Sequence, residues 1–269
     1  MWEGEAGPLA GFGAVFAAVF AALCLSRAVS RQCAAELAGV ACSFVHGSAC
    51  ALGAALALWR RAKEAEDVGW TQAVKGLAYA PNDAFEEALM QFSFAYFAVD
   101  TVYLLAFGRK SASETRLLIA HHVATSSYAA TSARFGVGAA GVMLLMGLGE
   151  FTSPTQNVWV AARALARRDA EASPAVRAAA QTAFAYLNPV YTALFTVNRC
   201  VLAPVPIWFL ILGLAADHRA GAVPLLCSLW WIGCTVGGTV GGFWWAFKLC
   251  KAFRTNAVAV TRERNAKRG

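Results

Sequence analysis

Apolar residues run along this chain in seven long stretches instead of alternating with polar residues. The stretches lie at 9–29, 37–59, 86–107, 116–133, 138–162, 184–214 and 222–247. A helix needs roughly 20 mostly apolar residues to cross a bilayer core about 30 Å thick. The pattern therefore predicts an all-α, polytopic transmembrane helical bundle of about seven spans.

The sixth stretch is too long for one straight crossing, and it contains Pro204 and Pro206. Proline removes a backbone hydrogen-bond donor and clashes with the preceding helical turn. We therefore expect one kinked helix over 184–214, with two short helices as the alternative.

The middle four stretches differ from the others because they carry ionisable or amide side chains at membrane depth. These side chains are Asp100, His121, His122, Glu150, Asn198 and Arg199. A charged group at the bilayer centre costs roughly 2.5–3.5 kcal/mol on insertion scales, so such groups face a bundle interior or a cavity. We therefore expect a central polar cavity that several helices share.

Two adjacent histidines are the strongest chemical signal in the chain. His121 and His122 lie about 100° apart around a helix axis, and Thr125 lies one turn further along. A neutral imidazole beside a carboxylate acts as a base near neutral pH. Asp100 is the candidate carboxylate, although an ion pair between Asp100 and Arg199 explains the same residues as structural.

Helical spacing brings further polar side chains to the same interior. Tyr96, Asp100 and Tyr103 share one stripe of their stretch, and Glu150 and Asn157 are seven residues apart. We expect these stripes to meet in one site. Its expected lining and lipid contacts are Tyr96, Tyr103, Thr125, Glu150, Asn157, Asn198 and Arg199.

Metal and cofactor sites are not indicated. Adjacent histidines on a helix diverge, and the i, i+4 spacing of helical metal sites is missing. The eight cysteines contain no C-x-x-C pair. We expect no bound metal and no resident cofactor.

Composition agrees with a membrane protein, and charge predicts its orientation. Of the 269 residues, 58% are hydrophobic and 14% are charged, whereas soluble domains are about a quarter charged. Lysines and arginines gather in the first, third and fifth loops and behind the last stretch, and such clusters mark the cytosolic face. We expect a lumenal or external N-terminus and a cytosolic C-terminus. This topology explains the net charge of +7 without a nucleic-acid partner.

Glycines recur every four residues in the last stretch, at Gly233, Gly237 and Gly241. Such a ridge lets another helix backbone approach closely. We expect it to serve internal packing, with a homodimer through the ridge as the alternative.

The stretch from Tyr96 to Trp159 resembles the TLC domain, which ceramide synthases, translocation-associated membrane proteins and small TLC-domain proteins share. The matching segments are A-V-D-T-V-Y around Asp100, H-H-V-A-T from His121, and G-L-G-E-F-T-S-P-T-Q-N from Gly147. The resemblance implies a helical bundle with a membrane-open cavity for a lipid acyl chain, and an endoplasmic reticulum location. It divides the chain into an anchor helix and first loop (1–36), a six-helix TLC domain (37–250) and a basic cytosolic tail (251–269).

In ceramide synthases the paired histidines move a fatty acyl group from coenzyme A to a sphingoid amine. The resemblance therefore assigns His121, His122 and Asp100 as candidate catalytic residues, with acyl-coenzyme A as co-substrate. Those enzymes continue with a histidine–aspartate pair and a further aspartate, where this chain has Gly149, Glu150 and Phe151. The chain is thus more similar to the small TLC-domain proteins, which implies membrane lipid homeostasis through binding or regulating lipid acyl chains. The alternative is an N-acyltransferase.

Overall fold

The computed structural model is helical along almost its entire described length. It describes residues 6–24, 29–107, 112–167, 170–217 and 223–266. The helices are α1 (Ala6–Cys24), α2 (Arg31–Glu64), α3 (Trp70–Gly76), α4 (Ala84–Phe107), α5 (Ala112–Phe135), α6 (Ala139–Glu150), α7 (Ser153–Leu165), α8 (Pro174–Val197), the π-helix η2 (Asn198–Leu202), α9 (Pro204–Asp217) and α10 (Leu225–Ala266). The predicted all-α class is confirmed.

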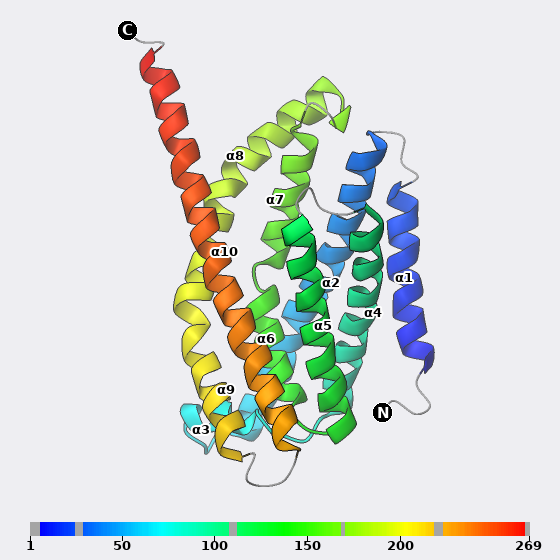
Figure 1. The fold of residues 1–269 in the computed structure, drawn as a ribbon, viewed down its shortest axis with the longest axis vertical. Coiled ribbons are helices and arrows are strands. Elements are labelled where there is room, and N and C mark those ends of the chain that lie inside the picture. The colour runs from blue at the N-terminus through cyan, green and yellow to red at the C-terminus, as the bar shows by residue number, and fades with distance from the viewer. Residues whose placement is uncertain (1–5, 25–28, 108–111, 168–169, 218–222, 267–269) are drawn as a thin grey trace.

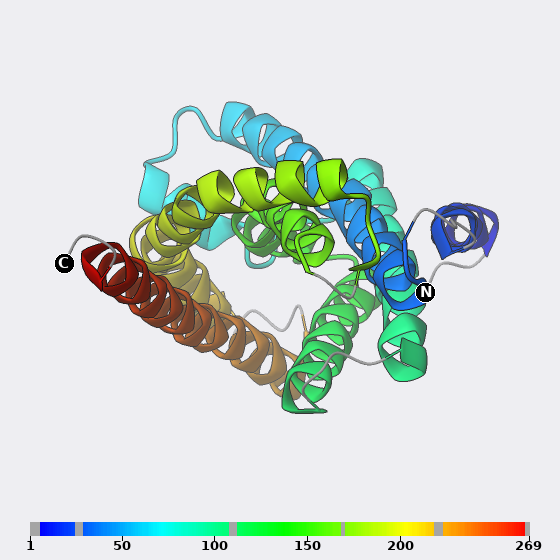
Figure 2. The same cartoon turned by 90° about the horizontal axis from the view of Figure 1, so that it is seen from above.

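The long helices run side by side along the length of the molecule, and the short α3 lies across one end (Figure 1). Seen from above, α1 stands at the outside, next to α2 and α4 (Figure 2). Phe16 of α1 packs there against Tyr96 and Phe97 of α4. The largest apolar core lies towards the α3 end, where α9 approaches α3 so closely at Gly213 that a Cβ atom would meet the Lys75 backbone.

Three described helices are long and apolar enough to cross a membrane: α2, α4 and the 225–255 part of α10. The pair formed by α8–η2 and α9, bent by 40°, makes a fourth if it counts as one span. Length and composition therefore account for three or four of the seven expected crossings. Helix α5 is too polar to qualify as a crossing by its composition. Helices α6 and α7 are each too short to cross a membrane alone.

Two expected helices are broken. The stretch 138–162 forms α6 and α7, separated at Phe151 and Thr152, with Pro154 in the first turn of α7. The stretch 184–214 forms the end of α8, η2 and α9, with Pro204 as the first residue of α9. Proline is tolerated in a first turn because its missing N–H has no intrahelical acceptor there. The expected single kinked helix is thus two helices joined by a π-helix.

The last helix is continuous over 42 residues, so the expected boundary at residue 250 falls inside α10. A methyl group added at Gly233, Gly237, Gly238 or Gly241 would meet no described atom within 4 Å. The expected internal packing of this ridge is therefore wrong at these positions. The reason is that these glycines lie on a face of α10 that no described helix covers, although α10 contacts α5, α8, α9 and η2 elsewhere.

Candidate functional site

A buried pair of acid and imidazole joins α4 to α5. The Asp100 carboxylate Oδ2 lies 3.5 Å from Nε2 of His122, and the Thr101 hydroxyl lies 3.2 Å from Nδ1 of the same ring. The Phe97 ring stacks on His122 at a centroid distance of 4.9 Å. His122 is only 6% exposed. Contacts on both nitrogens and on one ring face hold this imidazole in a fixed orientation.

The neighbouring His121 is in the opposite situation. Its side chain is exposed, and it forms no hydrogen bond with the described residues. Electrostatic interactions nevertheless connect it to Glu150 of α6, Arg199 of η2 and His46 of α2. Because these partners come from three other elements of the bundle, His121 lies within electrostatic reach of its interior. It is the imidazole that an incoming molecule can reach.

Glu150 lies at the break between α6 and α7. Its Oε2 accepts a hydrogen bond from the Ser153 hydroxyl at 2.6 Å. Both side chains press on Gly47 of α2, where an added Cβ would lie 2.6 Å from the Ser153 Cβ and 2.9 Å from Oε2. Gly47 thus makes room for the break that brings Glu150 inward. Sequence reasoning did not single out Gly47, because nothing in the spacing says which helix passes that point.

The π-helix supplies two donors to the end of α6. The Asn198 amide donates to the Leu148 carbonyl, and the Arg199 Nη2 donates to the Gly149 carbonyl, both at 2.7 Å. A helix end leaves such carbonyls without intrahelical partners, and inside a membrane each unsatisfied group costs several kcal/mol. Both predicted cavity residues therefore hold the broken helix together.

Arg199 is a cationic side chain that forms no ion pair with the described residues. Its guanidinium lies 5.2 Å from the Phe195 ring centroid, and its buried Nε has no hydrogen-bond partner within the described part of the chain. Gly242 of α10 admits its side chain, since a Cβ there would lie 3.2 Å from the Arg199 Cδ. Glu150 is the carboxylate that interacts electrostatically with it.

A second polar cluster lies between α2 and α4, and of its four residues only Tyr96 was predicted from the sequence. His46 Nε2 and Cys50 Sγ each lie 3.1 Å from the Ser93 hydroxyl, and the His46 ring stacks on Tyr96 at a centroid distance of 4.0 Å. All four side chains are buried. The available signal was a lone histidine within an otherwise apolar stretch.

The remaining predicted residues lie nearer the edges of the site. Tyr103 packs against α2, where an added Cβ on Gly39 would lie 2.9 Å from its ring. Asn157 donates to the Ser153 carbonyl of its own helix at 2.9 Å. Thr125 is half-buried on α5. The described residues contain no cluster of three or more His, Cys, Asp or Glu side chains suited to a metal ion.

Comparison with known proteins supports the resemblance. The family model described as the TLC domain matches residues 39–251, and this match confirms the resemblance. A TLC domain-containing protein of Arabidopsis thaliana is 31% identical over 166 residues, covering 61% of this chain and 61% of that protein. The match thus spans less than two thirds of the length of that relative. No solved structure matches the chain.

Proposed function

Because this chain belongs to the TLC-domain family, we propose that it is a multi-pass membrane protein that binds a lipid acyl chain within its helical bundle and so contributes to membrane lipid homeostasis. The observation that carries the proposal is His121, an exposed imidazole that interacts electrostatically with Glu150 and Arg199 and forms no hydrogen bond with the described residues. In an apolar bundle such a group is favourable only when a ligand or water satisfies it. The ligand we assign to it is the polar end of a lipid.

The groups around His121 match the polar part of a lipid. Glu150 offers a carboxylate that accepts hydrogen bonds, and Arg199 offers a guanidinium that donates them. Electrostatic interactions link both to His121. A headgroup with hydroxyl, amide or ester groups finds a donor, an acceptor and an imidazole in one place.

We propose that the lipid enters between α5 and α10. These helices touch where the Trp230 indole N–H donates to the Ser127 hydroxyl at 2.9 Å and the Cys234 thiol points to the Ala124 carbonyl at 3.7 Å. Both views show the helices separating beyond this contact, towards the C-terminal end of α10 (Figures 1 and 2). His121 is one turn further along the same stripe of α5, and Gly238 is one turn further along α10. An added Cβ at Gly238 would meet open space.

We also propose the full topology of seven crossings, formed by α1, α2, α4, α5, the α6–α7 pair, the α8–η2–α9 pair and α10. An odd number of crossings agrees with the start of α1 and the end of α10 lying at opposite ends of the bundle (Figure 1). The distribution of lysine and arginine supports a lumenal N-terminus and a cytosolic C-terminus. An endoplasmic reticulum location is part of the proposal and rests on the family.

Native mass spectrometry of the purified protein tests lipid binding. The wild-type protein should retain a lipid of defined acyl composition. His121→Leu should reduce that retention several-fold, because the polar end of the lipid loses its partner. Val123→Ala is the matched control, since Val123 is 59% exposed on the same helix and points away from His121. No retained lipid, or equal retention by both variants, would contradict the proposal.

The Asp100–His122 pair favours a second candidate, an N-acyltransferase that uses acyl-coenzyme A. Here the C–S bond of the thioester breaks, a C–N bond to a sphingoid amine forms, and the proton released by the amine moves through His121 to the coenzyme A thiolate. His122, held by Asp100, would position the reacting groups. This activity predicts release of free coenzyme A from protein in nanodiscs supplied with acyl-coenzyme A and a sphingoid base. His121→Ala should abolish the release, and no release with any chain length would exclude this candidate.

A further inference from the structure

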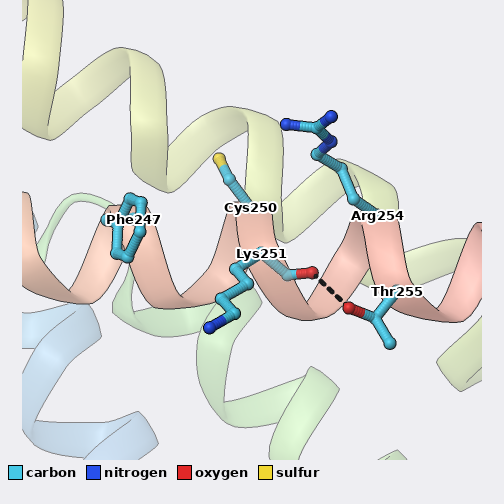
Figure 3. A pocket seen from close by; sticks show the side chains of 5 residues that line it. All are labelled: Phe247, Cys250, Lys251, Arg254 and Thr255. Carbon is cyan, nitrogen blue, oxygen red and sulfur yellow. Dashed lines mark hydrogen bonds between the residues drawn. The ribbon is translucent and has the colours of Figure 1, made fainter.

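A groove of about 390 Å³ runs along the C-terminal part of α10, away from the histidine site. It is lined by Phe247, Cys250, Lys251, Arg254 and Thr255. Figure 3 shows Cys250 and Arg254 projecting to one side of the helix and Lys251 to the other. The Cys250 thiol lies 3.4 Å from the Thr196 hydroxyl, which places α8 beside the groove.

The groove is basic and lacks acidic neighbours on the two helices that flank it. Neither α8 nor the 225–255 part of α10 contains an aspartate or a glutamate. Lys251 and Arg254 are both exposed and form no ion pair among the described residues. Thr255 is occupied, because its hydroxyl donates to the Lys251 carbonyl at 3.0 Å (Figure 3). The two cationic side chains are therefore the groups available to a ligand.

Aromatic side chains lie one to two turns before these charges. Trp244 and Phe247 are 53% and 60% exposed, and their rings stack at a centroid distance of 6.0 Å. Exposed aromatic rings followed by basic side chains are typical of a helix that leaves the hydrocarbon core and enters the headgroup region. The groove thus lies at headgroup level, with apolar side chains directed towards acyl chains and cationic ones towards phosphates.

We propose that this groove binds the phosphate of an anionic phospholipid from the surrounding leaflet. Lys251 and Arg254 are three residues apart and therefore neighbours on the helix surface, so their long side chains can turn to one phosphate placed between them. Phe247 contacts the first part of an acyl chain. Each basic side chain near an anionic membrane surface strengthens binding about fivefold, so two give a preference of about 25-fold over a neutral lipid. This site is separate from the histidine site and holds a structural or regulatory lipid.

The test measures the ratio of phosphatidylglycerol to phosphatidylcholine that the full-length protein binds from mixed micelles, by native mass spectrometry. The double variant Lys251→Gln, Arg254→Gln should lose the preference, and each single variant should lose about fivefold. Lys248→Gln is the matched control, because its ammonium lies over the Trp244 ring at 5.5 Å and outside the groove lining. It should keep at least most of the preference.

Two further arms separate the sources of phosphate and the two sites. Free coenzyme A, a soluble phosphate compound, should not displace phosphatidylglycerol, and displacement would overturn the assignment to a membrane lipid. His121→Leu should leave the phosphatidylglycerol preference unchanged. A double variant that folds as the wild type does, by its circular dichroism, and that keeps the full preference would overturn the proposal.

Discussion

Two polar clusters in this bundle are built in opposite ways. At the end where α2 meets α4, Glu86 is fully buried and accepts two hydrogen bonds from Arg61, at 2.9 and 2.8 Å. The Asp83 backbone N–H donates to the same carboxylate, and the neighbouring Asn82 amide bridges to the Ser132 carbonyl and the Ala139 N–H. Each of these polar side chains has its partner within the protein.

In the second cluster, formed by Asp100, His121, His122 and Arg199, only some of the polar groups have hydrogen-bond partners among the described residues. His122 has contacts on both ring nitrogens, whereas neither the adjacent His121 imidazole nor the buried Arg199 Nε has a hydrogen-bond partner among the described residues. A satisfied buried network stabilises a fold, while an open one is costly unless something else completes it. We infer from this contrast that the Glu86 cluster serves stability, and the proposed function assigns a ligand to the His121 cluster.

The largest expected effect on stability is at the Glu86 cluster, where the polar side chains are all hydrogen-bonded. Glu86→Leu should lower the free energy of unfolding by about 3–5 kcal/mol, because the Arg61 guanidinium loses two charge-assisted hydrogen bonds of about 1.5–3 kcal/mol each and its remaining ion pair, with Glu64, is longer, at 3.7 Å. Thermal or denaturant unfolding in detergent measures this loss. The control is Glu66→Gln in the pair with Lys63, where both side chains are more than half exposed and the effect should stay below about 1 kcal/mol. Equal losses in both variants would remove the contrast.

A substitution at the α6–α7 break should have an intermediate effect. Gly47→Val places atoms against Ser153 and Glu150 and should cost about 1–3 kcal/mol through overpacking, together with loss of lipid retention. Gly53→Val makes a matched control, because the three atoms nearest to a Cβ there all belong to the flexible Leu89 side chain. If Gly47→Val retained both stability and lipid, Gly47 would not be what admits the break.

Gly238→Leu should change stability least and impair lipid binding most clearly. Gly238→Leu fills the opening between α5 and α10 and should lower lipid retention several-fold, with a change in unfolding free energy within about 0.5 kcal/mol. Gly233→Leu adds the same side chain to open space on the outer part of the ridge and should retain the lipid. Equal retention by these two variants would place the entry elsewhere.

Much of the fold followed from the apolar stretches, since long runs at membrane length predict helices whatever their packing. The proximity of Asp100 and His122 also followed from helical stripes, because both side chains had to face inward. The break between α6 and α7 did not follow. It depends on Gly47 of α2 and on donors from Asn198 and Arg199, which only the tertiary arrangement brings to that point.

The difference between the two histidines could not be predicted from the sequence either. His121 and His122 are identical in type and adjacent in sequence, so periodicity assigns them one broad face. Which of them is enclosed depends on the positions of Phe97 and Thr101 on α4. The stacked His46–Tyr96 pair was hidden for the same reason, because register between α2 and α4 is set by packing.

The central claim is that the bundle keeps His121 open for the polar end of a lipid. A cryo-electron microscopy structure of the protein in nanodiscs tests it most directly. Our account predicts elongated lipid density that passes between α5 and α10 at Gly238 and ends within hydrogen-bonding distance of His121. Closed helices at that point, with the His121 imidazole bonded to a protein side chain, would contradict it.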